Sequence, residues 1–252
     1  MKGRFFVVIG GLLAAGLPVW CQQQYPLRSV TRTVVKPDHA AEWVDINKQA
    51  LEMIKKAGND RFNVVWQVAV GNTSEYLSVS PMSKYGERDQ PPPWVKNLPQ
   101  GISGLGVRRS NCIVSNVTTI ERYREDLSLA PPSSNTTATP PAYLRMLRTR
   151  VRQGKAEEYA TLIKSVLLPA YKKAGVTNFR VRQVAWGGNT NDFTSTTGFE
   201  KWAEIDEPSI LVKALGEEGA RQLAAKRNDL VTGTDYTILR YRADLSYLPE
   251  AR

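Results

Sequence analysis

The sequence contains little histidine and little cysteine, which excludes several kinds of site at once. Its 252 residues include one histidine and two cysteines. A site built from two imidazoles is therefore excluded, as are a four-cysteine zinc site and a small scaffold held together by disulfides. The sequence also shows no nucleotide-binding glycine loop, no metal-ligand cluster and no serine-histidine-acid set. From motifs alone we expect neither a cofactor nor a metal.

What is present is typical of a globular protein with its own core. Hydrophobic residues make up 42% of the chain and charged residues 23%, which is ordinary usage for soluble domains. The length allows one or two compact domains. The formal net charge is +10, from 34 Lys and Arg against 24 Asp and Glu. These charges are interspersed and form no basic block, so we expect no nucleic-acid partner.

Residues 1–21 have the pattern of a secretory signal peptide. Two cations, Lys2 and Arg4, precede an apolar run from Phe5 to Leu17. This run is shorter than the ~20 residues that a membrane-spanning helix needs. Cleavage after Cys21 is therefore expected to give an exported protein, periplasmic or secreted, with no membrane attachment. Lipid modification of Cys21 is the alternative.

The chain repeats itself at an offset that drifts from 116 to 118 residues. Four pairs of matching segments define the duplication: Lys55–Gly58 with Lys172–Gly175, Gln67–Ala69 with Gln183–Ala185, Gly71–Thr73 with Gly188–Thr190, and Arg122–Ser128 with Arg240–Ser246. Between the copies, residues 130–141 are rich in Pro, Ser and Thr and predict an extended linker. The two units are therefore expected to span residues 25–129 and 142–249.

Each unit is predicted to have the element order β-α-β-β-α-β. In the second copy, strand patterns cover residues 143–151, 179–186, 192–197 and 234–242, and helical patterns cover 154–174 and 209–226. Pro91-Pro92-Pro93 and three nearby glycines predict a short or broken second helix in the first copy. The first helix of the second copy is one residue longer and contains Pro169, which predicts a bulge or kink.

This order is that of the ferredoxin-like split motif, whose sheet carries helices on one face and leaves the other bare. Two copies in one chain resemble a fused form of the dimeric α/β barrel superfamily, which includes the NIPSNAP, antibiotic-biosynthesis-monooxygenase-like and EthD-like families. Gln153-Gly154-Lys155 is similar to the strand-to-helix entry of such families. The resemblance implies an α+β protein whose two units pack sheet to sheet. Its members include cofactor-independent oxygenases, haem-binding or haem-degrading enzymes, and proteins without known activity.

Gln67 and Gln183 occupy equivalent positions in strands that are otherwise mostly apolar. A polar amide in such a strand needs hydrogen-bond partners if it is buried. One interpretation is that these amides line a ligand cavity between the two sheets. The other is that they form structural hydrogen bonds across the pseudo-twofold interface.

The last strand of each unit alternates arginine with tyrosine, in Arg122-Tyr123-Arg124 and in Arg240-Tyr241-Arg242. Successive strand residues point to opposite faces, so the two arginines share one face and the tyrosine takes the other. Inward-pointing arginines would suit a carboxylate, phosphate or sulfate ligand. Alternatively, they form a solvated strand end and pair with Asp126 or Asp244.

The second copy also carries arginines that the first copy lacks. Arg148, Arg150, Arg180 and Arg182 align with Thr31, Thr33, Val64 and Trp66. An arginine inside a strand is costly unless it is solvated, paired or bound to a ligand. We therefore predict that an anionic ligand contacts the second unit through Arg182, Arg240 and Gln183, with Gln67 as the equivalent amide.

Three further features have two interpretations each. His39 is either a haem ligand or general base, or a solvated residue in the first turn of a helix. Cys112 has no intrachain disulfide partner if Cys21 is removed, and is expected to be a buried small hydrophobe. Most large aromatics are expected in the core rather than at a ligand: Trp43, Trp66, Tyr76, Tyr159, Trp186, Phe193 and Trp202.

The sequence thus leaves three functions open. The first is an exported protein of unassigned activity that binds a small anionic or aromatic organic ligand between its two sheets. The second is a cofactor-independent oxygenase or isomerase of the same fold. The third is a structural or interaction module whose interior is filled. Fold analogy does not choose among them.

Overall fold

The computed structural model describes residues 26–59, 61–130 and 140–248. The signal peptide predicted at residues 1–21 and most of the predicted linker lie outside the described residues. Within the described ranges, no helix is both long enough and apolar enough to cross a membrane.

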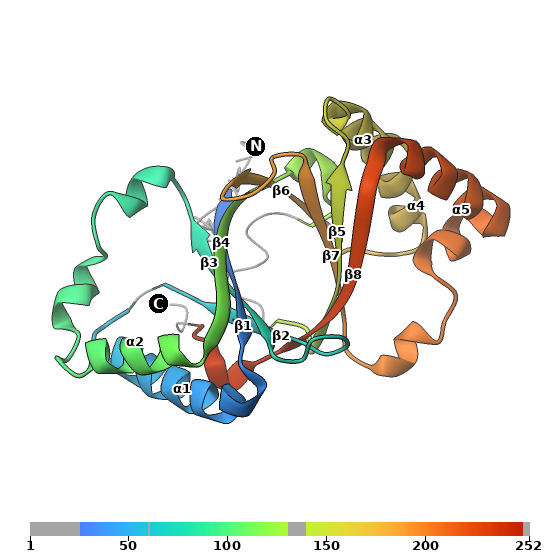
Figure 1. Ribbon diagram of the computed structural model, residues 1–252. Coiled ribbons are helices and arrows are strands. Elements are labelled where there is room, and N and C mark those ends of the chain that lie inside the picture. The colour runs from blue at the N-terminus through green and yellow to red at the C-terminus, as the bar shows by residue number, and fades with distance from the viewer. Residues whose placement is uncertain (1–25, 60, 131–139, 249–252) are drawn as a thin grey trace, which may run out of the picture.

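The described residues contain eight strands, which close into one antiparallel barrel with the order β1-β3-β2-β8-β5-β7-β6-β4 (Figure 1). Their bounds are β1 Leu27–Val35, β2 Val64–Val68, β3 Glu75–Met82, β4 Ile113–Tyr123, β5 Tyr143–Val151, β6 Arg180–Trp186, β7 Asp192–Phe199 and β8 Val231–Tyr241. Strands β1 to β4 come from the first unit and β5 to β8 from the second. The predicted fold, two tandem ferredoxin-like units that form a fused dimeric α/β barrel, is confirmed.

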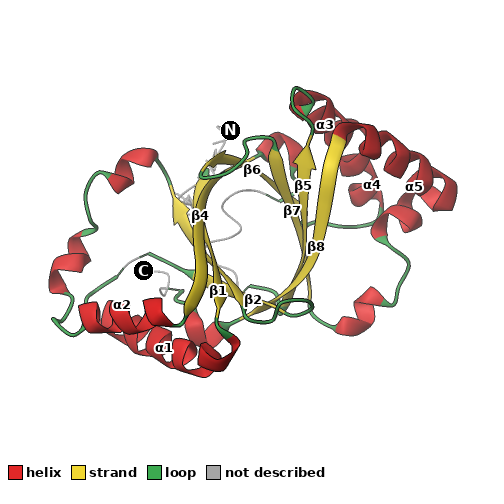
Figure 2. Ribbon diagram, viewed as in Figure 1, coloured by secondary structure: helices red, strands yellow, loops and turns green. Residues whose placement is uncertain are grey.

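The helices lie outside the barrel in two groups, one for each unit (Figure 2). Their bounds are α1 Ala40–Lys56, α2 Ile102–Asn111, α3 Ala156–Leu162, α4 Leu168–Lys173 and α5 Ile210–Leu230. Helices α1 and α2 cover the first unit's sheet, and α3 to α5 cover the second unit's sheet. The inner face of each sheet is left to face the other unit.

The two units are joined by hydrogen bonds at two seams. Strand β2 pairs with β8 at one seam, where Trp66 lies opposite Tyr241. Strand β4 pairs with β6 at the other, where Tyr123 lies opposite Arg182. Because the barrel closes at these seams, the edge strands of each unit's sheet are hydrogen-bonded to the other unit, and neither sheet has an unpaired edge within the described chain.

The first helix of the second unit contains the predicted irregularity. Residues Ile163–Leu167 form a π-helical turn between α3 and α4, whereas α1 runs without interruption over 17 residues. A π-turn accommodates one extra residue within a helix, which is the difference in length between the two copies. The predicted short second helix of the first unit is also confirmed, because α2 has 10 residues and α5 has 21.

Among the described residues, buried apolar side chains form three main clusters. One lies between helices and sheet in the first unit, around Trp43 and Ile46. A second lies between helices and sheet in the second unit, around Tyr159 and Phe193. The third lines the inside of the barrel and includes Trp66.

The expected positions of the aromatic residues are confirmed for five of the seven. Trp43, Trp66, Tyr76, Tyr159 and Phe193 are buried. Two expectations are wrong: Trp186 is 64% exposed and Trp202 is 43% exposed. Trp186 is the last residue of β6 and lies on the strand face of Arg182 and Val184, not on the face that packs against the helices. Trp202 begins a short 3-10 helix after β7 and packs edge-on against Phe199 and Tyr143.

Candidate ligand-binding site

The second unit contains a cavity of about 480 Å³ between its helices and the outer face of the barrel. The floor comes from strands β5, β7 and β8, and the cover from α3, the π-turn, α4 and the start of α5. Two features of the helices shape this cover. Ile163 and Leu167, the first and last residues of the π-turn, both line the cavity. Gly216 takes φ 72° and breaks α5, and Ile210 and Leu211 before this break line the cavity too.

The aromatic lining of the cavity carries neutral hydroxyl groups. Tyr159 and Tyr171 both line it, and burial raises the pKa of Tyr171 to about 12. Burial also raises the pKa of Tyr159, whose hydroxyl lies 3.2 Å from Thr149 Oγ1. Tyr171 stacks on Phe179 with their ring centroids 4.3 Å apart. Both tyrosines are therefore protonated at neutral pH. The hydroxyl of Tyr159 donates to Thr149, whereas Tyr171 can donate a hydrogen bond to a ligand.

Two guanidinium groups supply the positive charge of the cavity. Arg227 Nη1 donates to the hydroxyl of Tyr236 over 3.2 Å. Its Nε is buried and has no hydrogen-bond partner within the described part of the chain. Arg145 lies over the ring of Phe199 and donates to the carbonyl of Glu204 over 2.6 Å. Among the described residues that line the cavity there is no Asp, Glu, His or Cys.

The first unit has a smaller cavity of about 320 Å³ at the equivalent position, beneath α1. Half of its lining residues are polar, and several of these form hydrogen bonds with one another. Thr31 and Thr118 share one of 2.9 Å, and Thr33 donates to Asn116 over 3.2 Å. The two copies have therefore diverged, and the larger and more apolar cavity belongs to the second unit.

The predicted amides Gln67 and Gln183 lie at the two seams of the barrel and make equivalent hydrogen bonds. Arg240 and Arg242 of the second unit each donate to Gln67 Oε1 over 2.8 Å, and the Gln67 amide nitrogen donates to the carbonyl of Thr73. At the opposite seam, Arg124 donates to Gln183 Oε1 over 2.8 Å. Each glutamine thus joins its own hairpin to the last strand of the other unit.

The arginines beside these amides pair with the acids named in the sequence analysis. Arg124 binds Asp126, and Arg242 binds Asp244, at 2.9 and 2.8 Å. Tyr123, between two of the arginines, is buried on the other face of its strand. The acid pairing named in one of the two interpretations is therefore present, but the side chains of Arg124 and Arg242 are only 18% and 16% exposed and are not solvated.

Arg182 lies apart from the other predicted ligand residues. It is 5% exposed, and its guanidinium carbon lies 4.9 Å from the ring centroid of Tyr123. Burial lowers the pKa of Arg182 well below its usual value, and its Nη1 has no hydrogen-bond partner among the described residues. Gln183 follows it in β6 and points to the opposite face. The sequence prediction grouped Arg182, Gln183 and Arg240 around one ligand, and the structure does not bring them together.

The alignment of the other second-unit arginines needs a correction of one residue. The pairing with the neighbouring strand shows this, because Tyr76 and Phe193 are equivalent and lie opposite Thr33 of β1 and Thr149 of β5. Counted from these partners, Arg148 is the counterpart of Arg32 in the first unit, not of Thr31, and a shift of one residue reverses the face of every side chain. In the same alignment, Val34 rather than Thr33 is the counterpart of Arg150.

The corrected alignment explains Arg148 as half of a repeated ion pair. Arg148 binds Asp192 at 2.7 Å, and Arg32 binds Glu75 at 2.6 Å at the equivalent place in the first unit. Arg148 is therefore not a gain of the second copy. Arg150, which is paired with Asp235, remains without a cationic counterpart.

Comparison with known proteins gives a structural likeness only. No protein-family model matches the chain, and no curated protein does. A proposed monooxygenase from Lactobacillus acidophilus is 10% identical, with a TM-score of 0.56 over 89% of this chain and 97% of that one. An anthrone oxidase-like protein is 8% identical, with a TM-score of 0.56 over 88% and 93%.

A mutant chlorite dismutase from Candidatus Nitrospira defluvii is 9% identical, with a TM-score of 0.53 over 88% of this chain and 94% of that one. At such identities the likeness shows the fold alone. The protein thus has the dimeric α/β barrel fold, with both units in one chain. Its activity has to be argued from its own residues.

Proposed function

We propose that the protein binds a small aromatic anion in the cavity of the second unit. The observation that carries this proposal is an apolar, tyrosine-bearing cavity of about 480 Å³ that contains two guanidinium groups and, among its described lining residues, no carboxylate. Cavities of this size are typical of small-molecule sites. The ligand would lie between sheet and helices, not between the two sheets as the sequence suggested.

The charge of the lining favours an anion over a neutral ligand. Arg227 has a buried Nε without a hydrogen-bond partner among the described residues, and such a group is costly unless a ligand supplies an acceptor. The protonated hydroxyl of Tyr171 adds a donor for a carboxylate, sulfonate or phenolate. The rings of Tyr159 and Tyr171 and the stacked Phe179 favour an aromatic body for the same molecule.

Binding is proposed in preference to catalysis because of what the lining offers. An oxygenase that works on an aromatic phenol must first remove a proton from it. The titratable groups that line the cavity in the described structure are tyrosines and arginines. A tyrosine with a raised pKa is a poor base near neutral pH, so the described lining residues supply no general base.

The proposal can be tested with two matched dyes. 1-Anilinonaphthalene-8-sulfonate carries an aromatic body and one sulfonate, and N-phenyl-1-naphthylamine is the same body without the charge. Fluorescence titration should show one site that prefers the sulfonate. Arg227→Gln should weaken sulfonate binding about tenfold, or ~1.4 kcal/mol, and leave binding of the neutral dye nearly unchanged. Arg109→Gln, which alters a lining residue of the first unit's cavity, is the control and should change neither.

Two further measurements separate the alternatives. If the double variant Arg182→Ala with Arg240→Ala lost sulfonate binding while Arg227→Gln kept it, the ligand would bind at the residues that the sequence indicated. Oxygen uptake with anthrone tests catalysis, because oxidation of anthrone by one O₂ gives anthraquinone and one water. Catalysed uptake that Leu167→Trp abolishes by filling the cavity would make the protein an oxygenase.

A further inference from the structure

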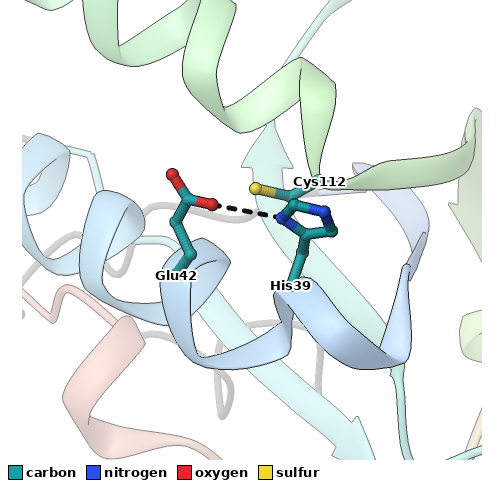
Figure 3. Close-up of side chains that lie close together, drawn as sticks. All are labelled: His39, Glu42 and Cys112. Atoms are coloured by element: carbon teal, nitrogen blue, oxygen red, sulfur yellow. Dashed lines mark hydrogen bonds and ion pairs between the residues drawn. The ribbon is translucent and has the colours of Figure 1, made fainter.

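Three side chains that can bind a metal meet in the first unit, where α1 begins and α2 ends, and none of them lines either cavity. His39, Glu42 and Cys112 each offer one ligand atom, and these atoms all lie within 4.8 Å of one another. Figure 3 shows His39 and Glu42 on the first turn of α1, with Cys112 at the end of α2. His39 Nδ1 lies 3.2 Å from Glu42 Oε2. A tetrahedral zinc ion with bonds of ~2.0–2.3 Å holds its ligand atoms roughly 3.3–3.8 Å apart, so small side-chain rotations would complete the site.

The backbone around this cluster is fixed by hydrogen bonds. Lys36 donates its backbone N–H to the carbonyl of Cys112 over 2.8 Å, which ties the end of β1 to the end of α2. The backbone N–H of His39 donates to the carbonyl of Lys36 over 3.0 Å. The cluster therefore exists before any ion arrives, and little ordering would be needed on binding.

Groups around the cluster orient two of the ligands. Arg108 lies 3.4 Å from Oε1 of Glu42, so Oε2 is the oxygen left facing His39. The second ring nitrogen of His39 lies 3.6 Å from a carboxylate oxygen of Asp38. A carboxylate on the far nitrogen of a ligating histidine fixes the ring and raises its basicity.

The second unit has the same backbone arrangement and a different set of side chains. Helices α1 and α3 begin at Ala40 and Ala156, so Lys155 and Glu158 replace His39 and Glu42. Lys155 and Glu158 form an ordinary ion pair of 2.6 Å. Leu230 takes the place of Cys112, and its carbonyl accepts the equivalent backbone hydrogen bond, 2.8 Å from Arg152. Where the second unit has an ion pair and a leucine, the first unit thus has three groups that can bind a metal.

We propose that His39, Glu42 and Cys112 form a binding site for Zn²⁺ or a similar divalent ion. Imidazole, carboxylate and thiolate together suit zinc better than magnesium or calcium, which prefer oxygen ligands. Three protein ligands leave the fourth tetrahedral position to water. His39 and Glu42 are 39% and 43% exposed, and the ion reaches the buried sulfur from their side.

A nucleophilic role for Cys112 fits the same geometry less well. Cys112 is fully buried, and its Sγ lies 3.4 Å from the carbonyl of Arg108. Burial raises the pKa of the Cys112 thiol, whereas catalytic thiols are exposed and have lowered pKa values. The residues that line the first unit's cavity include neither His39 nor Cys112.

Cobalt titration of the chelator-treated protein tests the proposal, because a thiolate bound to Co²⁺ gives a charge-transfer absorption that imidazole and carboxylate do not. We expect this absorption to saturate at one Co²⁺ per chain and to disappear when Zn²⁺ is added. Cys112→Ala should abolish it. His39→Asn and Glu42→Gln should each weaken Co²⁺ binding at least tenfold.

Glu158→Gln in the second unit is the matched control and should leave cobalt binding unchanged. If Cys112→Ala does not fold, the exposed His39→Asn still decides the question. Absence of the charge-transfer absorption in the wild type at excess Co²⁺ would overturn the proposal. So would an unchanged affinity for Co²⁺ in His39→Asn.

Discussion

Arg182 packs its guanidinium against the ring of Tyr123 at one seam of the barrel, 4.9 Å from the ring centroid. At the other seam, the equivalent positions hold Trp66 and Tyr241, with ring centroids 5.5 Å apart. The two contacts are four strands apart in the closed barrel. One seam is therefore closed on the inside by an aromatic pair and the other by a cation on an aromatic ring.

This difference predicts the effect of removing the buried charge. Arg182 has an unpartnered Nη1 among the described residues, while the nearby Glu121 already has Arg28 at 2.7 Å. Arg182→Met would leave no buried carboxylate unpaired, so we expect it to stabilise the fold by ~1–2 kcal/mol, since a well-packed apolar side chain often outperforms a buried charge. The measurement is the free energy of unfolding in urea.

Arg28→Met is the matched comparison for Arg182→Met. It removes the partner of buried Glu121, and we expect a loss of ~3 kcal/mol or more. A loss of similar size for Arg182→Met would show that its contact with Tyr123 holds the seam together.

Gln67→Ala and Gln183→Ala test whether the seam amides are structural. Each amide accepts from an arginine of the other unit at 2.8 Å, so each substitution should cost ~1–2 kcal/mol of unfolding free energy. Because the two seams are far apart, the double variant should lose the sum of the two. Dye binding in the second unit's cavity should stay unchanged, and a loss of dye affinity in either variant would return that glutamine to the ligand site.

Acid stability is expected to depend on Asp244. Its hydrogen bond with Arg242, together with Lys48, lowers the pKa of Asp244 to about 2. A lowered pKa in the folded state stabilises the fold above the unfolded pKa, and this contribution is lost as pH falls through the folded value. Urea midpoints measured from pH 6 to pH 2 should therefore fall below pH ~4, and Asp244→Asn should remove part of that fall. Equal slopes in both proteins would contradict this assignment.

Much of the fold could be predicted because the duplication leaves a direct trace in the sequence. The extra residue in the first helix of the second copy, together with Pro169, also predicted an irregularity there, and the structure has a π-turn. The alignment of Arg148 was missed because the offset of 117 residues between Lys55 and Lys172 was applied to the first strands, where strand pairing gives 116. The extra residue of the π-turn lies between these two places. The second unit's cavity was missed because its lining comes from strands and helices far apart in the chain. His39 and Cys112 were considered singly, and only the folded chain brings them together.

Position 187 is expected to require glycine, because the backbone of β4 lies very close to it at the seam between β4 and β6. Gly187 follows β6 with φ 79°, and a Cβ there would overlap the carbonyl oxygen of Thr118 in β4. Gly187→Ala should therefore cost more than the ~1–2 kcal/mol of a left-handed backbone alone. Gly154→Ala is the control, since Gly154 has φ 75° and open space around it. Equal losses of unfolding free energy would show that the contact with Thr118 relaxes freely.

The last prediction concerns the π-turn and the cavity that it helps to cover. Ser165 is exposed and lies in the middle of the π-turn, so deleting it restores the helix length of the first unit. Because π-helical turns are rare and less favourable than α-helix, we expect the deletion variant to fold with an uninterrupted helix. The same deletion rotates Leu167 relative to Ile163, and both line the cavity. Binding of 1-anilinonaphthalene-8-sulfonate should therefore weaken at least tenfold while the unfolding transition stays cooperative.

Deletion of Gln49 provides the control, because Gln49 is exposed at the equivalent position of α1, which has no π-turn to absorb the loss. Removing it turns the residues that follow, including Ala50 and Met53, away from the face that holds Trp43 and Ile46, and should destabilise the first unit strongly. The two deletions should differ because the helix with the π-turn contains one extra residue, whereas α1 does not. If both deletions destabilised the protein alike, the π-turn would be a structural requirement of the second unit. If the Ser165 deletion kept full dye affinity, the cavity would not depend on the π-turn, and its cover would have to come from α5.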